Sequence, residues 1–219
     1  MQENINNYER KVTCFERIFS YSPFSVVTVV ARINGNVTKE MLMNAVFKVQ
    51  QRHTNLRTRI RKDGEQNPWY TTNDVNYIPT LIVSRESDET WIQVQKEMSQ
   101  TPFRFEKCPP IRFILVQSPN VSELIILCHH IICDGLSLAY LARDMMIHLG
   151  DLEKKAKMLP NPIPIDLNNL PKGVSINPIR KFLINRINER WKKEPVIFDQ
   201  EDYENINKAY WNQAQNYSY

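Results

Sequence analysis

The chain has 219 residues, of which 42% are apolar and 24% charged, and its formal net charge is +4. This length and composition suit a globular domain with a substantial core. No apolar run approaches the ~18 to 20 residues of a membrane-spanning helix. The polar N-terminus lacks the apolar core of a signal peptide, so we expect a cytoplasmic protein. The basic runs at 57–62 and 190–193 carry no interleaved aromatic residues, which argues against nucleic-acid binding.

Strand and helix patterns alternate along the first 150 residues. A β-branched strand is expected at 25–35, where it ends in an Asn-Gly turn, and a helix capped by Thr38 follows to about residue 52. The segments 55–60 and 77–83 read as short strands, and 87–103 reads as a helix that ends near Pro102. Two strands occupy 109–130 around a turn at 118–123, and a helix runs from Gly135 to Gly150. This order predicts an α/β (α+β) sandwich, a mixed sheet with helices packed on it.

The composition changes near residue 154. Residues 158–178 contain five prolines and show little periodicity, so we interpret 154–178 as an extended connector. We therefore divide the chain into a lobe at 1–153, this connector, and a helical segment at 179–219. The basic helix of that segment places Phe182, Leu183, Ile187 and Trp191 toward one face. That face could dock on the protein itself or lie on a membrane surface.

Two adjacent histidines, His129 and His130, end an apolar run in "LIILCHHIICDGLSLAYL" at 124–141. In a strand they would point to opposite faces, so only one can face a given cleft. An imidazole at the end of a sheet strand can accept a proton from a nucleophilic hydroxyl, amine or thiol near neutral pH. Asp134, at the expected helix start, could hydrogen-bond an imidazole or pair with an arginine. Gly135 has no Cβ, which would leave room for a ligand close to the backbone or allow unusual backbone torsions.

Three other interpretations of the same residues remain open. Cys128, His130, Cys133 and Asp134 include ligand types that zinc takes. The two histidines could both be buried structural residues. Ser137 could be a nucleophile with a histidine base, although no G-x-S-x-G elbow occurs and capping is usual at that position. The four cysteines, which also include Cys14 and Cys108, follow no disulfide or CxxC pattern, and we expect free, mostly buried thiols.

"HHIICDG" at 129–135 resembles the HHxxxDG signature of the chloramphenicol-acetyltransferase-like superfamily. This superfamily includes condensation domains of nonribosomal peptide synthetases and the alcohol and polyketide-associated acyltransferases. Two further segments are similar to condensation-type motifs, "QRHTNLRTRI" at 51–60 and "TPFRFEKCPPIRFILV" at 101–116. Arg104 and Ile60 depart from the usual acidic residue and phenylalanine.

The resemblance implies a role for each motif residue. His130 would be the general base that deprotonates or positions the acceptor, and His129 would be structural. Asp134 would form a buried ion pair with Arg57 that holds the loop, so that Asp134→Ala would damage folding as much as activity. Gly135 would keep the substrate tunnel open beside His130.

The resemblance also implies what the protein acts on. An acyl group would move from a thioester, either acyl-CoA or the phosphopantetheine arm of a carrier protein, to an amine or hydroxyl. No tightly bound cofactor and no metal are expected. Two-lobed members are about twice this length, so the chain corresponds to the N-terminal lobe, inactive alone, which would associate with a missing lobe or with itself. The alternative is a non-catalytic binding or assembly lobe that keeps the motif for its fold.

Overall fold

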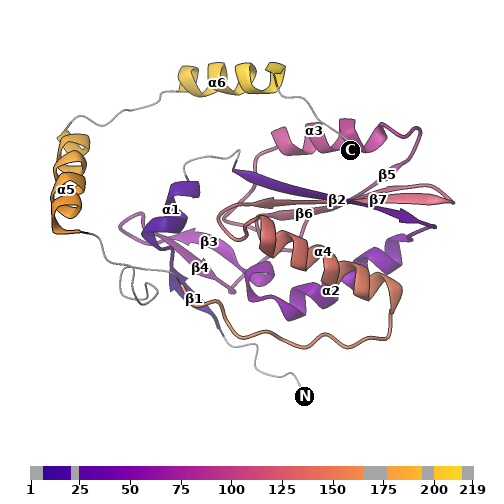
Figure 1. Ribbon diagram of the computed structural model, residues 1–219. Helices are drawn as coiled ribbons and strands as arrows, with labels where there is room; N and C mark the ends of the chain where they lie inside the picture. Colours follow the sequence, from indigo (N-terminus) through magenta and orange to yellow (C-terminus); the bar gives the residue numbers. More distant parts are fainter. Residues whose placement is uncertain (1–6, 21–24, 165–176, 194–199, 214–219) are drawn as a thin grey trace. The chain divides into compact units, whose positions relative to one another are not determined.

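The computed structural model describes residues 7–20, 25–164, 177–193 and 200–213 (Figure 1). The chain divides into two compact units, residues 1–169 and 170–219. In the first unit the elements are β1 (Glu9–Lys11), α1 (Cys14–Ser20), β2 (Val26–Asn34), α2 (Lys39–Arg52), the 3-10 helix η1 (Thr54–Arg57), β3 (Arg59–Lys62), β4 (Pro68–Thr71), β5 (Thr80–Ser84), α3 (Thr90–Gln100), β6 (Ile111–Gln117), β7 (Val121–His129) and α4 (Gly135–Gly150). The second unit contains α5 (Pro178–Lys193) and α6 (Gln200–Gln213).

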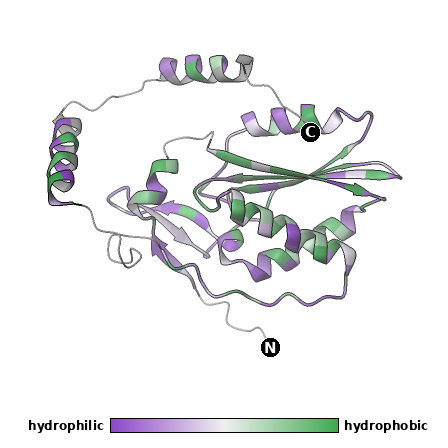
Figure 2. Cartoon of the chain, in the orientation of Figure 1, coloured by the Kyte–Doolittle hydropathy of each residue, from purple (hydrophilic) through white to green (hydrophobic). Residues whose placement is uncertain are grey.

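A four-stranded mixed sheet with the order β2-β7-β6-β5 forms the centre of the first unit. β7 is antiparallel to both neighbours, while β5 and β6 are parallel. One face packs mainly against α2 and α4, and the other packs against α3. Figure 2 shows apolar residues along the strands and on the helix faces turned toward them. The predicted α/β sandwich with helices packed on a mixed sheet is therefore confirmed.

Helix α2 illustrates how the sequence pattern builds this sandwich. The Thr38 side chain accepts a hydrogen bond from the backbone N–H of Met41 at 3.2 Å, as the predicted N-cap requires. The predicted apolar stripe faces the sheet and is buried at Leu42, Ala45, Val46 and Val49. The helix stops at Arg52, and His53 in extended backbone donates its N–H to Val49.

The structure differs from the sequence-based expectation in three places. Residues 54–57 form a 3-10 helix where a strand was predicted, because the Thr58 hydroxyl and N–H both bond the carbonyl of Asn55 and close a tight turn. The strand β3 begins only at Arg59. β1, β4 and β3 form a separate three-stranded antiparallel sheet. The elements β1 and α1 were not predicted.

The chain after α4 first runs along helix α2. Residues 154–164 contain no helix or strand. The Leu159 N–H donates to the carbonyl of Arg52 at 2.9 Å, and the Arg52 guanidinium donates to the carbonyl of Lys157 at 2.9 Å. This stretch of the predicted connector thus bonds to the first unit. Part of the connector lies outside the described residues, and the three-part division stays a prediction.

Arg112 of β6 fastens α3 onto the sheet. Its guanidinium donates to the carbonyls of Met98, Thr101 and Pro102 at 2.8, 2.8 and 2.5 Å, and it lies 4.1 Å from the ring centroid of Phe103. The residue is only 9% exposed. One side chain therefore bonds the last turn of α3, at Met98, and the two residues that follow the helix, Thr101 and Pro102.

We predict that Arg112→Met lowers the free energy of unfolding by about 2–3 kcal/mol, because three charge-assisted hydrogen bonds are lost while the apolar volume is kept. Chemical denaturation followed by circular dichroism measures the change. Arg104→Met, at an exposed arginine in the same segment, should stay within about 0.5 kcal/mol. Equal losses in the two variants would contradict a specific role for Arg112.

Candidate active site

The two histidines lie where β7 ends and the chain turns toward α4. His129 is the last residue of β7, and His130 opens the turn. The Ile132 N–H donates to the carbonyl of His129 at 3.1 Å and closes that turn, while the His130 N–H donates to the carbonyl of Ser25 at 2.7 Å. These two hydrogen bonds therefore fix the backbone at both histidines, whose side chains have different surroundings.

His129 is fully buried. Its Nδ1 accepts a hydrogen bond from the backbone N–H of Ile131 at 3.2 Å, which sets the ring orientation. The ring meets Phe105 and Phe103 edge-on, with centroid distances of 4.8 and 5.8 Å. This packing is what a structural role requires, and that role stays a prediction.

His130 is half-buried and stands against helix α1. Its ring stacks on Phe19 with a centroid distance of 4.7 Å and an interplanar angle of 10°. Within the described residues neither ring nitrogen has a hydrogen-bond partner, and neither is a buried, unsatisfied atom. One face of the imidazole is therefore held by an apolar ring, while no described residue occupies its nitrogens.

Asp134 caps helix α4. Its carboxylate accepts the Ser137 N–H at 2.7 Å. Hydrogen bonds from the hydroxyl and N–H of Ser137 hold the pKa of Asp134 below its usual value. Asp134 is therefore the N-cap, and Ser137 is the residue whose N–H it caps.

The predicted ion pair between Asp134 and Arg57 is wrong for the chain as described. Arg57 donates instead to the Thr54 hydroxyl at 3.3 Å, its Nε is buried without a partner in the described residues, and burial lowers its pKa. The 3-10 turn at 54–57 keeps Arg57 beside Thr54, and the helix N-terminus occupies the Asp134 carboxylate. Asp134 is exposed, so Asp134→Ala breaks no buried ion pair, and the expected severe damage to folding does not follow.

Gly135 opens α4 and is exposed. A Cβ built on it would meet no described atom within 4 Å, and its φ is not positive. Neither backbone torsion nor crowding in the described chain therefore requires glycine here. The role implied by the resemblance, an open tunnel beside His130, stays a prediction.

No group of three or more histidine, cysteine, aspartate or glutamate side chains in the described part of the chain is placed to hold a metal ion. Cys128, His130, Cys133 and Asp134 all lie in that part, and the structure does not gather three of them as metal ligands. The expectation of free thiols is confirmed for Cys108, Cys128 and Cys133.

Phe19 is the site residue that sequence reasoning missed. Its helix begins with a capping box, in which the Glu16 carboxylate accepts the Thr13 N–H at 2.9 Å and the Glu16 N–H donates to the Thr13 hydroxyl at 3.3 Å. Arg10 of β1 binds the same carboxylate through two nitrogens at 2.7 and 2.6 Å. The signal "TCFE" at 13–16 was visible in the sequence and would have located this helix.

The positions of α1 and of the histidine turn are set by the same buried tyrosine. The Arg10 guanidinium lies 4.4 Å from the ring centroid of Tyr70. The Tyr70 hydroxyl donates to the carbonyl of Ile131, inside the turn, at 2.6 Å. Arg10 in turn binds Glu16 of α1. Tyr70 thus contacts both parts of the stack, the turn that carries His130 directly and the helix that carries Phe19 through Arg10.

A second buried carboxylate supports the segment "RHTNLRT" at 52–58. Asp144 of α4 is 4% exposed, and its Oδ2 lies 2.7 Å from Arg52 Nε and 2.9 Å from His53 Nε2. Its other oxygen accepts from Arg143 at 3.0 Å. Burial raises the pKa of Asp144, but the hydrogen bonds from Arg143, Arg52 and His53 outweigh burial and hold this pKa below its usual value. Burial lowers the pKa of His53, although Asp144 opposes that shift.

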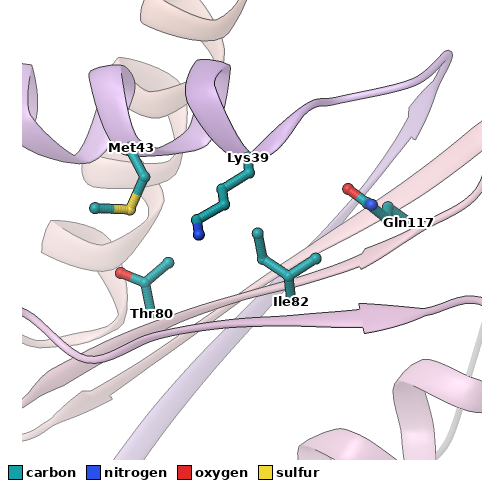
Figure 3. A pocket seen from close by; sticks show the side chains of 5 residues that line it. All are labelled: Lys39, Met43, Thr80, Ile82 and Gln117. Carbon is teal, nitrogen blue, oxygen red and sulfur yellow. The ribbon is translucent and has the colours of Figure 1, made fainter.

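A hollow of about 350 Å³ lies away from the histidines. It is lined by Lys39, Met43, Thr80, Ile82 and Gln117, and Figure 3 shows the Lys39 side chain reaching from α2 toward the sheet. Gln117 pairs with Ser122 near the start of β7, whereas His129 ends that strand. None of the motif residues lines this hollow, so the candidate active site is the turn at the other end of β7.

A family model for the condensation domain matches residues 9–164. The chain is 35% identical over 125 residues to a polyketide synthase-nonribosomal peptide synthetase of Aspergillus clavatus, an alignment that covers 55% of this chain and 3% of that protein. It is 28% identical over 144 residues to a linear gramicidin synthase of Brevibacillus parabrevis, which covers 63% and 3%. No helix in the described segments is both long and apolar enough to cross a membrane.

Solved structures show the same fold. The condensation domain of the Monacolin K polyketide synthase MokA has a TM-score of 0.59 at 11% identity, covering 68% of this chain and 36% of that one. The starter condensation domain of rhizomide synthetase RzmA has a TM-score of 0.57 at 14% identity, covering 84% and 44%. A variant of that domain was solved in complex with C8-CoA, with a TM-score of 0.54 at 16% identity, covering 63% and 34%. The chain thus spans less than half of each of these structures.

We predict that Asp144→Ala lowers the free energy of unfolding by about 3 kcal/mol, because three cationic or hydrogen-bonding partners lose a buried acceptor. Asp134→Ala should cost only about 1 kcal/mol, the usual value of an exposed N-cap. Denaturation of the two variants compares these losses directly. The Asp144 contribution is complete above the ordinary carboxyl pKa of about 4 and is lost as the pH falls through the lowered folded value. Equal losses at pH 7 would contradict the assignment.

We predict that Phe19→Leu moves the His130 ring proton signals downfield in nuclear magnetic resonance spectra, because the stacked ring no longer shields them. The accompanying loss of stability should be about 1 kcal/mol. Phe15→Leu, on the same helix, is the control and should leave the His130 signals in place. Unchanged His130 signals in Phe19→Leu would show that the two rings do not stack in solution.

This site lies at the end of a strand in a mixed sheet, and solved structures with this fold are condensation domains. The family model covers the sheet, the histidine turn and α4 together. The chain belongs to the condensation-domain family.

Proposed function

We propose that this chain forms the N-terminal half of a condensation-type acyltransferase with His130 as its general base. The observation that carries the proposal is the half-buried imidazole at the end of β7, with one face stacked on Phe19 at 4.7 Å and its nitrogens without a partner in the described chain. His129, which is buried and bonded to Ile131, would hold the strand end in place. This division gives each histidine one task.

In the proposed reaction an amine or hydroxyl acceptor binds beside His130. The imidazole takes a proton from the amine or hydroxyl of the acceptor while the nitrogen or oxygen of that group attacks the thioester carbonyl. General-base catalysis of this kind typically contributes ~10²–10⁴ in rate. The tetrahedral intermediate then collapses, the C–S bond breaks, and the thiol leaves with a proton. No tightly bound cofactor enters this scheme.

The acyl donor would be a thioester of coenzyme A or of a carrier protein's phosphopantetheine arm. The relatives named above are a polyketide synthase-nonribosomal peptide synthetase and a linear gramicidin synthase, which favours a carrier-bound donor and a carrier protein as partner. The starter condensation domain in complex with C8-CoA favours acyl-CoA. Both donors present the same thioester to the same base. We expect the protein to work in the cytoplasm.

The other half of the site would come from outside this chain. Leu136 and Tyr140, in the first two turns of α4, are 64% and 50% exposed, beside the histidine turn. We propose that a second lobe covers this apolar surface in the full-length protein. In the isolated chain, self-association would cover it.

We predict that His130→Ala, made in a protein that contains both lobes, lowers kcat/KM by about 10² or more, because the proton acceptor is lost. The thermal unfolding midpoint should fall by only about 2–4 °C, because the stack on Phe19 is lost as well. Transfer from an acyl thioester to an amine or alcohol is the assay. Tyr77→Ala, at a site 92% exposed, is the control for handling effects.

A non-catalytic binding lobe is the competing function. It predicts no turnover by the intact protein and unchanged ligand binding in His130→Ala. Full turnover in His130→Ala would contradict our assignment of the base, and no turnover in the two-lobed wild type would favour the binding lobe.

A further inference from the structure

We propose that Cys128 and Cys133 form a peroxide-sensitive dithiol that closes into a disulfide around the histidine turn. The inference rests on where the fold brings the two sulfur atoms and does not depend on the proposed acyl transfer. Peroxides are the oxidant class, and the product is a ring that contains both histidines.

The turn brings the two cysteines together. They flank the four residues 129–132, whose ends are joined by the hydrogen bond from the Ile132 N–H to the His129 carbonyl at 3.1 Å. The sulfur atoms of Cys128 and Cys133 lie 3.7 and 3.9 Å from that same carbonyl oxygen. The two thiols also contact each other, so their sulfur atoms are neighbours, as the short S–S bond of a disulfide requires.

The two thiols differ in access. Cys128 is fully buried, while Cys133 is half-buried. Burial raises the pKa of the Cys128 thiol well above its usual value, and contact with the Cys133 thiol raises it further. Cys133 is therefore the sulfur that meets an oxidant first, and Cys128 is the resolving thiol behind it.

The chemistry balances with one peroxide. The Cys133 thiolate attacks a peroxide oxygen, the O–O bond breaks, and the departing hydroxide takes the thiol proton as water, which leaves a sulfenic acid. The Cys128 sulfur then attacks the sulfenic sulfur, the S–S bond forms, the S–O bond breaks, and the second hydroxide leaves as water with the Cys128 proton. Two thiols give up two electrons, and the peroxide accepts them.

Closure would change the histidine turn. Both thiols now point at the His129 carbonyl, and linking them to each other withdraws those contacts and tightens the ring around His129 and His130. Cys108, by contrast, contacts the carbonyl of Arg104 at 3.7 Å and has no role in the pair.

The chain itself offers a clean test. Trypsin cleaves after Arg112 and Arg143, and the sequence between contains no lysine or arginine, so Cys128 and Cys133 share one peptide while Cys14 and Cys108 fall on two others. The reduced 219-residue chain is treated with hydrogen peroxide, alkylated, digested without reductant and weighed by mass spectrometry. We expect the shared peptide to lose two hydrogen atoms and to resist alkylation until dithiothreitol is added.

Two controls sharpen the result. Before oxidation, Cys133 should alkylate at least about tenfold faster than Cys128, as accessible thiols do relative to buried ones. Cys108→Ser should leave the cross-link intact, and Cys133→Ser should abolish it and leave Cys128 as a free thiol. A sulfinic acid at Cys133 beside a free Cys128, a disulfide to Cys14 or Cys108, a link between chains, or full alkylation after peroxide would each overturn the proposal.

A second measurement, which does rest on the proposed function, addresses the consequence for His130. In a two-lobed protein, peroxide should reduce transfer activity, dithiothreitol should restore it, and Cys133→Ser should resist the loss. If the reduced protein shows no turnover at all, the proposed function fails, and the peptide mapping still decides the fate of the cysteine pair.

Discussion

The double-sided burial of β7 is the constraint on which the rest of the structure depends. All residues of this strand from Ser122 to His129 are buried, with β2 and β6 bonded on either side. A strand in this position leaves no polar group to solvent, so every polar side chain on it must find a partner inside the protein. The partners that it finds hold distant parts of the chain in register.

Both ends of β7 show how this constraint works. At the start, Glu123 is 1% exposed and binds Arg85 at 3.0 Å and Arg32 at 3.1 Å, which ties β2 and the end of β5 to the central strand. At the other end, His129 takes the N–H of Ile131, and the strand cannot continue because the chain reverses there. The polar residues of β7 therefore sit at its two ends, and the apolar residues between them form the core on both faces.

The sequence predicted local features well and distant pairings poorly. The Thr38 cap, the α2 stripe and the opening of α4 at Gly135 follow from residues within one or two turns of each other, and each of them was predictable. Asp144 meets Arg52 across 92 residues of sequence, and no local pattern announces that contact. The predicted ion pair between Asp134 and Arg57 is the opposite case. The resemblance implied a pair between distant residues, while in the described chain the Asp134 carboxylate binds its near neighbour Ser137. Phe19 lies between these cases, since its helix carried a readable capping box but its stack on His130 depends on Tyr70.

The spacing of "HHIICDG" has a physical meaning in this fold. His129 must end the buried strand, and the turn that closes on its carbonyl needs three further residues, His130 to Ile132. Asp134 must then stand one residue before α4 for its carboxylate to take the Ser137 N–H. Cys133 is the single residue between turn and cap, and its sulfur lies near the same His129 carbonyl as that of Cys128. An insertion or deletion between His130 and Asp134 would either open the turn or uncap the helix, and the imidazole of His130 would lose the fixed position against Phe19 that makes it a candidate base.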